Sequence, residues 1–171
     1  MRGRNVLAKQ VLILFDRCVG CRSCQLACAV AHSEARNLFG AVVGGEKPRS
    51  RVFVHQAGAR KGPLNCRHCQ DAPCIDACIT GAMHRREDGT VTNVGGAQTC
   101  TACWMCLMVC PYGAVVGDEA GTAAVKCDRE CRNTAGVPAC VKACPTGALT
   151  YGEVDDFSAR RREDVLRRVL A

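Results

Sequence analysis

Short apolar runs bordered by polar residues predict the strands of this chain. Residues 11–15, 51–55 and 115–116 are rich in Val, Ile, Leu and Phe, which is typical of short strands. The C-terminal stretch has a different period, in which apolar residues recur at helical spacing with arginines between them. These apolar residues are Phe157, Val165, Leu166, Val169 and Leu170. We therefore expect a few short strands and an amphipathic C-terminal helix or tail at residues 153–171.

Cysteine dominates the composition and narrows the possible functions. The chain has 171 residues, of which 16 are cysteine, against only 4 Phe, 2 Tyr and 1 Trp. This length suits one domain or two small ones, but so few aromatic residues make a thin hydrophobic core. At this cysteine density the candidate classes are a secreted disulfide scaffold, a zinc protein and an iron-sulfur protein.

The beginning of the sequence shows no export signal. Residues 1–10 are polar, and the apolar run at residues 11–15 is too short for a signal core or a membrane span. No paired-arginine signal is present either. We therefore expect a cytoplasmic protein without direct membrane insertion, in which thiols stay reduced and dense cysteines more often hold metal than form disulfides.

The cysteines form four groups of four with none left over. Group one is Cys18, Cys21, Cys24 and Cys28; group two is Cys66, Cys69, Cys74 and Cys78; group three is Cys100, Cys103, Cys106 and Cys110; group four is Cys127, Cys131, Cys140 and Cys144. Groups one and three have the C-x2-C-x2-C-x3-C spacing of bacterial ferredoxins. In such a run, three closely spaced thiolates reach three irons of one cubane cluster, and the fourth thiolate belongs to the second cluster of a pair. The spacing therefore predicts paired 4Fe-4S clusters.

A second repeat follows the fourth cysteine of groups two, three and four. It reads Cys-Ile-Thr-Gly-Ala-Met from Cys78, Cys-Pro-Tyr-Gly-Ala-Val from Cys110 and Cys-Pro-Thr-Gly-Ala-Leu from Cys144. We expect each copy to be a short helical turn that starts at the cysteine and ends at the glycine, followed by a strand. Proline suits the first turn of a helix, where its missing N–H costs no hydrogen bond. Group one differs, because Cys28 leads into a longer helical stretch.

Two other kinds of metal chemistry compete with this interpretation. Structural zinc sites are usually assembled from two separated C-x2-C pairs or from mixed cysteine and histidine ligands, which group four resembles more than the other groups do. Runs of three cysteines at three-residue intervals fit zinc poorly. The C-x3-C-x2-C triplet of radical enzymes begins at Cys127 but has Thr134 at its third cysteine position.

The net charge of the chain suggests a different class of partner once the charge of the clusters is included. A formal net charge of +7 would ordinarily suggest a nucleic-acid, membrane-surface or acidic partner. Each oxidised 4Fe-4S cluster with its four thiolates adds about two negative charges, so four clusters bring the total close to zero. We interpret most arginines as counter-charge for buried anionic clusters, and expect no nucleic-acid binding in the absence of an aromatic stacking platform.

The cysteine groups resemble those of the four-cluster ferredoxin-type electron-transfer subunits of anaerobic oxidoreductases, over residues 10–150. This family includes the iron-sulfur subunits of dimethyl-sulfoxide reductase, formate hydrogenlyase, carbon monoxide dehydrogenase and tungsten aldehyde oxidoreductase systems. Residues 18–33 and 103–106 are most similar to the carbon monoxide dehydrogenase and aldehyde oxidoreductase groups. The resemblance implies an α+β fold of small, nested, bacterial-ferredoxin-like modules, with clusters in the cores and little regular secondary structure.

The resemblance also implies which cysteines share a cluster, because the groups of this family pair in a nested way. Site 1 would have Cys18, Cys21, Cys24 and Cys144; site 2 would have Cys127, Cys131, Cys140 and Cys28; site 3 would have Cys66, Cys69, Cys74 and Cys110; site 4 would have Cys100, Cys103, Cys106 and Cys78. Three residues separate Cys127 from Cys131, where the family more often has two. The local geometry of Cys131 is therefore an open question.

The implied organisation has four parts. Residues 1–31 and 120–152 would form an outer ferredoxin-like module, and residues 66–119 a central one. Residues 32–65 would be an inserted surface arm, which either docks a partner or is a solvated loop. The helix at residues 153–171 would either dock on a catalytic subunit or cap its own domain.

The function implied is one-electron relay without catalysis by this chain. We expect four 4Fe-4S clusters that connect a catalytic oxidoreductase subunit with a second electron donor or acceptor protein, with a tungsten or molybdenum aldehyde oxidoreductase or a carbon monoxide dehydrogenase-like enzyme preferred. A further hypothesis is self-association into a longer cluster chain. The alternatives are a free polyferredoxin carrier and a zinc-binding interaction module. No G-x-G-x-x-G or Walker-type loop supports a nucleotide site.

A few residues near the cysteines have two interpretations. His68 lies between Cys66 and Cys69 and either tunes the central clusters or is simply packing. Trp104 either shields a cluster or docks a partner, or it simply belongs to the hydrophobic shell.

Overall fold

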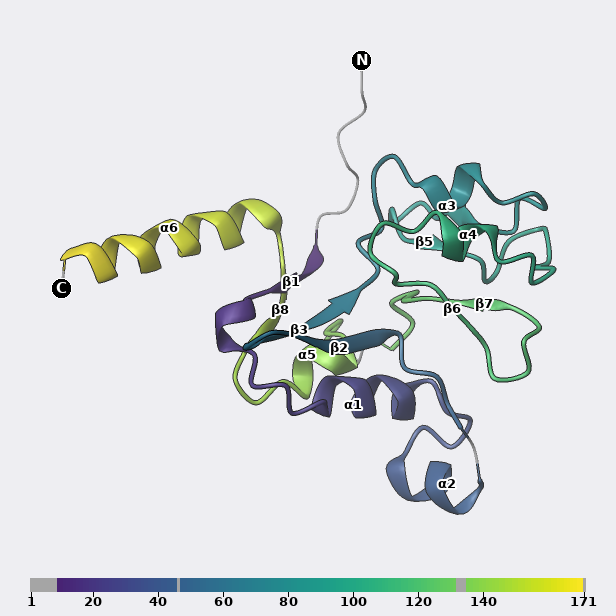
Figure 1. The fold of residues 1–171 in the computed structure, drawn as a ribbon, viewed down its shortest axis with the longest axis horizontal. Helices are drawn as coiled ribbons and strands as arrows, with labels where there is room; N and C mark the ends of the chain where they lie inside the picture. Colours follow the sequence, from purple (N-terminus) through teal and green to yellow (C-terminus); the bar gives the residue numbers. More distant parts are fainter. Residues whose placement is uncertain (1–8, 46, 132–134, 171) are drawn as a thin grey trace.

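Two hydrophobic cores, each lined with cysteines, organise the chain (Figure 1). The computed structural model describes residues 9–45, 47–131 and 135–170, so the N-terminal segment searched for a signal and the position of Thr134 lie outside it. Within these residues the secondary structure consists of short helices and four two-stranded antiparallel sheets. The fold is α+β with little regular structure, as predicted.

The outer lobe is closed by the two ends of the chain. Strand β1 (Gln10–Ile13) pairs antiparallel with β8 (Leu149–Gly152), in the register Val11 opposite Tyr151. A 3-10 helix, η1 (Phe15–Arg17), follows β1, and α1 (Ser23–Ala31) packs against α5 (Ala139–Lys142). The first and last cysteine groups thus lie side by side in one core.

The central lobe holds the second and third cysteine groups. Helices α3 (Pro73–Asp76) and α4 (Met105–Met108) pack against each other. The hairpin of β4 (His84–Arg85) and β5 (Val91–Thr92) lies in the first half of this lobe, and that of β6 (Val116–Gly117) and β7 (Ala124–Val125) in the second. Its core contains Met83, Val91 and Val115, each at most 3% exposed.

The segment predicted as a surface arm contains two different structures. Helix α2 (Leu38–Val43) stands away from the body, and its Phe39 is 78% exposed (Figure 1). Strands β2 (Val52–Ala57) and β3 (Arg60–Asn65) form a hairpin whose β2 packs on α1, with Val52 buried in the outer core. The second half of the arm is therefore an integral part of the outer lobe.

The predicted helices after the fourth cysteines of groups two, three and four are wrong. Helices α3, α4 and α5 each contain the third cysteine of their group, Cys74, Cys106 and Cys140, and end before the fourth. The fourth cysteine instead opens a turn closed by a glycine N–H on its carbonyl. These bonds are Gly81 to Cys78 (3.0 Å), Gly113 to Cys110 (3.2 Å) and Gly147 to Cys144 (3.4 Å). The prolines after two of these cysteines therefore occupy turn positions, where their fixed φ is also favourable, rather than helix N-termini.

Three predicted strands are confirmed with small shifts. Residues 11–15 overlap β1 at three positions, although η1 takes Phe15, and residues 51–55 overlap β2. Residues 115–116 overlap β6 by one position. In each Gly-Ala repeat the aliphatic residue lies at or next to the start of a strand, as predicted, because the turn redirects the chain along the cluster site.

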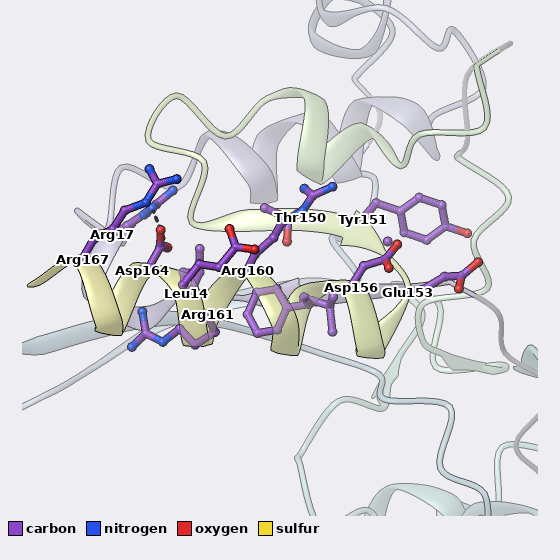
Figure 2. A pocket seen from close by; sticks show the side chains of 14 residues that line it. Leu14, Arg17, Thr150, Tyr151, Glu153, Asp156, Arg160, Arg161, Asp164 and Arg167 are labelled. Carbon is purple, nitrogen blue, oxygen red and sulfur yellow. Dashed lines mark ion pairs between the residues drawn. The ribbon is translucent and has the colours of Figure 1, made fainter.

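The predicted C-terminal helix is confirmed as α6 (Val154–Leu170). Together with residues of β1, η1 and β8, this helix lines a groove of about 380 Å³. Arg17 and Asp164 form an exposed ion pair there (Figure 2). The second half of α6 projects from the body, leaving Val165, Leu166, Val169 and Leu170 exposed (Figure 1). Among the described residues, no helix is both long and apolar enough to cross a membrane.

Candidate metal centres

The loop that begins each cysteine group has the same backbone bend. The residue two positions after the first cysteine has a left-handed conformation in all four groups. These residues are Gly20 (φ 73°), His68 (φ 47°), Ala102 (φ 54°) and Arg129 (φ 63°). Only glycine adopts this conformation without cost, so three of the four loops hold a strained residue. Such strain is retained at functional sites, where the loop geometry serves a ligand.

Group four shares this bend despite its unusual spacing. Arg129 occupies the position that Gly20, His68 and Ala102 occupy in the other groups. The extra residue, Glu130, therefore comes after the bend and before Cys131. The first loop of group four therefore has the same bend as the others, and the longer spacing comes after it.

For three of the four predicted sites, all four cysteines line one cavity. The cavity of site 1 contains all four of its cysteines, and the same is true of sites 3 and 4. The four thiols of site 2 are also close neighbours, because Cys127, Cys28 and Cys131 each raise the pKa of Cys140 in addition to the effect of burial. In the described part of the chain, no three His, Cys, Asp or Glu side chains converge on a position for a single metal ion.

Thiols of neighbouring sites are close enough to influence one another's pKa, and these pairs order the four sites in a row. Beyond the effect of burial, the pKa of a thiol in one site is raised by a thiol of the next site. The pairs are Cys140 with Cys24, Cys127 with Cys66, and Cys74 with Cys106. The neighbours are therefore sites 1 and 2, sites 2 and 3, and sites 3 and 4.

Backbone N–H groups point at several of the cysteine sulfurs in the described part of the chain. The donors and acceptors are Arg51 to Cys28 (3.2 Å), His68 to Cys66 (3.4 Å), Met83 to Cys78 (3.3 Å), Ala114 to Cys110 (3.4 Å) and Ala124 to Cys100 (3.4 Å). Met83 and Ala114 belong to the Gly-Ala repeat, whose turn directs their N–H groups back at the preceding fourth cysteine. Such donors stabilise an anionic sulfur, which is the form that binds iron.

Burial opposes the same ionisation at several cysteines. It raises the pKa of the Cys24, Cys74 and Cys127 thiols to about 11. At Cys78 and Cys144 burial also raises the pKa, but hydrogen bonds from nearby backbone N–H groups outweigh it and lower the pKa overall. Buried thiols of this kind become thiolates only when a cation replaces the proton, so metal loading releases protons.

An arginine and an aspartate form a buried ion pair beside site 2. The Arg51 guanidinium donates to the Asp128 carboxylate, which is only 5% exposed, and His32 Nε2 lies 3.3 Å from the same carboxylate. Burial lowers the pKa of Arg51, and the thiols of Cys28 and Cys127 partly offset this effect. The arginine therefore faces both its carboxylate and the sulfurs of site 2.

Comparison with known proteins shows the family. The model of a 4Fe-4S dicluster domain matches residues 60–154, which include groups two, three and four. The chain belongs to this family. Its cofactors are 4Fe-4S clusters, in agreement with a donor set made entirely of thiols with backbone N–H groups directed at them. The resemblance drawn from the cysteine spacing is confirmed.

Relatives of similar length carry electron-transfer and reductase names. The chain is 40% identical over 168 residues to "Iron-sulfur protein" of Rhodospirillum rubrum, covering 90% of this chain and 87% of that protein. It is 34% identical over 164 residues to "Thiosulfate reductase electron transfer subunit PhsB" of Salmonella typhi, covering 92% and 83%. It is also 34% identical over 150 residues to one of the chains of the anaerobic dimethyl sulfoxide reductase of Escherichia coli (strain K12), covering 83% and 72%.

A solved structure is also similar. The match is to "Active site complex BamBC of Benzoyl Coenzyme A reductase as isolated", with a TM-score of 0.47 and 24% identity, and it covers 85% of this chain and 76% of that one.

The residues near the cysteines differ in their surroundings. Trp104 lines the cavity of site 4 and lies against Gly117, where an added Cβ would meet its ring at 3.0 Å. His55 is exposed, and His84 Nδ1 lies 2.9 Å from the Ala82 carbonyl. Sequence reasoning missed Asp128, because nothing in a run of charged residues distinguishes a buried carboxylate from a solvated one.

Proposed function

We propose that this chain is the electron-transfer subunit of an oxidoreductase complex and holds four 4Fe-4S clusters on its 16 cysteines. The observation that carries the proposal is the gathering of cysteines into four sites that follow one another in a row. A linear series of sites suits conduction across a distance better than a single storage site would.

The proposed ligand sets are those implied by the family resemblance. Site 1 has Cys18, Cys21, Cys24 and Cys144; site 2 has Cys28, Cys127, Cys131 and Cys140; site 3 has Cys66, Cys69, Cys74 and Cys110; site 4 has Cys78, Cys100, Cys103 and Cys106. Sites 1 and 2 belong to an outer module of residues 1–31 and 120–152, and sites 3 and 4 to a central module of residues 66–119. The hairpin of β2 and β3 completes the outer module, while α2 and α6 extend from the body. Electrons would enter and leave at the two ends of the row, sites 1 and 4.

The chain itself contributes binding, hydrogen bonding and exclusion of water rather than bond-making chemistry. When bound, each cluster accepts and releases one electron at a time. The backbone N–H groups of Met83 and Ala114 stabilise negative charge on their cysteine sulfurs, and the buried apolar residues around each site keep water away. No residue of this chain is assigned a catalytic role.

The partners follow from this role. One is a catalytic oxidoreductase subunit and the other is a second electron donor or acceptor protein. The names of the thiosulfate and dimethyl-sulfoxide reductase relatives support a reductase as the catalytic subunit, whereas the residues around Cys18 and Cys103 favour a tungsten or molybdenum aldehyde oxidoreductase or a carbon monoxide dehydrogenase-like enzyme. A free polyferredoxin carrier is the second candidate.

Two experiments test the proposal. The tagged chain, isolated without oxygen from its own cells at native level, should co-purify with a larger metal-containing subunit in fixed stoichiometry. Isolation as a lone, fully loaded chain would favour the free carrier.

The second experiment tests the assignment of Cys131. The variant Cys131→Ala should lose about a quarter of the iron, as expected for loss of one cluster in four, and should keep sites 3 and 4. An unchanged iron content would remove Cys131 from the ligand set.

A further inference from the structure

A histidine and a lysine are buried beside site 3 in a way that the fold of the protein alone does not explain. His68 is 1% exposed and Lys126 is 2% exposed. Both line the cavity that contains Cys66, Cys69 and the other two cysteines of site 3. Both are polar groups whose hydrogen-bonding capacity is only partly used by the described protein atoms.

The hydrogen bond at one ring nitrogen of His68 fixes where its proton lies. The Val91 N–H donates to Nδ1 over 3.0 Å, so Nδ1 carries no hydrogen and the single ring hydrogen is on Nε2. Nε2 is buried and has no hydrogen-bond partner among the described residues. A buried donor without an acceptor is costly, and buried polar groups of native proteins are almost always hydrogen bonded.

Lys126 is a buried cation without a negatively charged partner among the described residues. Its Nζ donates to the carbonyl oxygens of Val91 and Cys127, and no carboxylate of the described residues pairs with it. An unpaired buried cation is strongly unfavourable. Lys126 also lines the cavity that contains the four cysteines of site 3, so their thiolates are the nearby source of negative charge.

The other sites lack such a combination. The described residues that line the cavity of site 4 include no charged side chain other than its cysteines. At site 2 the corresponding groups have protein partners: Arg51 is paired with Asp128, and Arg129 donates to the Lys9 carbonyl. His32 Nδ1 lies 2.7 Å from the Cys28 carbonyl and its Nε2 lies 3.3 Å from Asp128. Site 1 has Arg22 at its edge, in a loop at the surface. Within the described residues, site 3 alone combines a buried ammonium with a buried N–H donor.

We propose that His68 and Lys126 give site 3 the highest reduction potential of the four clusters. Reduction adds one electron and hence one negative charge to the cluster, without transfer of a proton. The Nε2–H group of His68, hydrogen bonded to a cluster sulfur, and the ammonium of Lys126 both stabilise that added charge. Site 3 is an inner member of the row, and Lys126 connects Val91 of the central module with Cys127 of the outer one, so an electron entering the row rests at the junction of the modules. This inference rests on the proposed function.

The test is a redox titration of the full, anaerobically loaded chain, followed by electron paramagnetic resonance. Lys126→Met removes the charge at similar volume, and Lys126→Arg keeps it. His68→Asn keeps a residue that tolerates the left-handed backbone and removes the Nε2–H donor. His55→Asn, on the exposed part of β2, is the matched control. Cys69→Ser marks which midpoint belongs to site 3.

We expect the highest midpoint to fall in Lys126→Met and His68→Asn, by at least a tenfold loss in the equilibrium constant for reduction, which is about 59 mV for one electron. Lys126→Arg and His55→Asn should leave it close to that of the unmodified protein, and Cys69→Ser should alter the same midpoint. The inference would be overturned if Lys126→Met and His68→Asn both held four clusters with unchanged midpoints. It would also be overturned if they shifted a midpoint that Cys69→Ser does not alter. Either result would leave the electron-transfer function unaffected. A chain that binds no iron would instead refute the proposed function.

A second measurement needs no variant and covers the case of a variant that fails to load. In protein labelled with ¹⁵N-histidine, the signal that appears first on reduction should show coupling to one histidine nitrogen in pulsed electron paramagnetic resonance. Absence of that coupling from the first signal would equally overturn the role of His68.

Discussion

The buried pair of Arg51 and Asp128 leads to the sharpest prediction about stability, because its two members should not be equivalent. Each side chain is mostly inaccessible to water, at 18% and 5% exposed. Arg51→Leu leaves the Asp128 carboxylate buried next to the anionic sulfurs of site 2. Asp128→Leu leaves the Arg51 guanidinium next to those same sulfurs, which still compensate its charge. Loss of the arginine should therefore cost more than loss of the aspartate.

The magnitude follows from the burial of the pair. Removing one member of a buried ion pair typically costs about 3–5 kcal/mol. For a chain of this size, each kcal/mol shifts the midpoint of thermal unfolding by roughly 2–4 °C, so Arg51→Leu should lower it by roughly 6–20 °C. The double variant Arg51→Leu/Asp128→Leu should be more stable than Arg51→Leu, because it buries no unpaired carboxylate. The exposed pair of Arg17 and Asp164 (Figure 2), with 49% and 42% exposure, supplies the control. Arg17→Leu should change the midpoint by less than about 4 °C, because exposed pairs contribute about 0–1 kcal/mol.

The assay is loss of cluster absorbance on heating under argon, at one scan rate for all variants because the loss is irreversible. The expected order of midpoints is unmodified protein and Arg17→Leu highest, then Asp128→Leu and the double variant, and Arg51→Leu lowest. If Arg51→Leu and Asp128→Leu lose the same amount, the sulfurs of site 2 do not act as counter-charge for Arg51. If neither differs from Arg17→Leu, the buried pair has no special importance.

Three further predictions concern the loops, the tail and the loading of the chain. Ala102→Gly should be neutral or should raise the midpoint of cluster loss on heating, because Ala102 has φ 54° and glycine adopts this backbone without strain; a lower midpoint would show that the left-handed loop is not strained. Truncation after Asp164 should leave the iron content unchanged, because the removed residues of α6 are exposed, and should weaken co-purification with the catalytic subunit; a loss of iron would assign the tail to the cluster modules. Cluster assembly on the apo chain should become faster as pH rises from about 7 to 9, because buried thiols with pKa raised to about 11 ionise more as pH increases; a rate independent of pH would separate thiol ionisation from loading.

The sequence predicted the parts of the fold that depend on local spacing. The three-residue intervals between cysteines and the Cys-x-x-Gly-Ala repeat both describe short loops, so their chemistry can be recognised without tertiary information. The helix at residues 154–170 was likewise predictable, because its apolar residues follow the helical period over several turns.

The positions of the short helices were not predictable in the same way. A single helical turn around the third cysteine carries no periodic pattern, and proline after the fourth cysteine suits a turn as well as a helix start. The left-handed residues were also hidden, since Arg129 and Ala102 are not residue types that usually adopt such a conformation. Only the shared position two residues after the first cysteine, seen once the backbone is known, relates them to Gly20.

Long-range pairing explains the remaining gaps. Val52 belongs to the outer core because β2 packs against α1, and no local pattern distinguishes it from a residue in a solvated arm. Asp128 and Lys126 flank Cys127 in sequence, yet one pairs with an arginine 77 residues away and the other contacts a carbonyl 35 residues away. The contact of Lys126 with Val91 joins the two modules, and the pair of Arg51 and Asp128 joins the segment of residues 32–65 to the outer module.

The central claim, four 4Fe-4S clusters on sixteen cysteines, is tested most directly by the content of iron, acid-labile sulfide and zinc per chain. The protein should be purified and kept without oxygen, with the absorption spectrum recorded before and after dithionite. We predict about 16 iron and 16 sulfide per chain and a broad visible band that bleaches on reduction. Zinc without sulfide and without a reducible band would contradict the account. About 12 iron per chain would show that one of the four sites does not hold a complete cluster, and site 2 would be the first to examine.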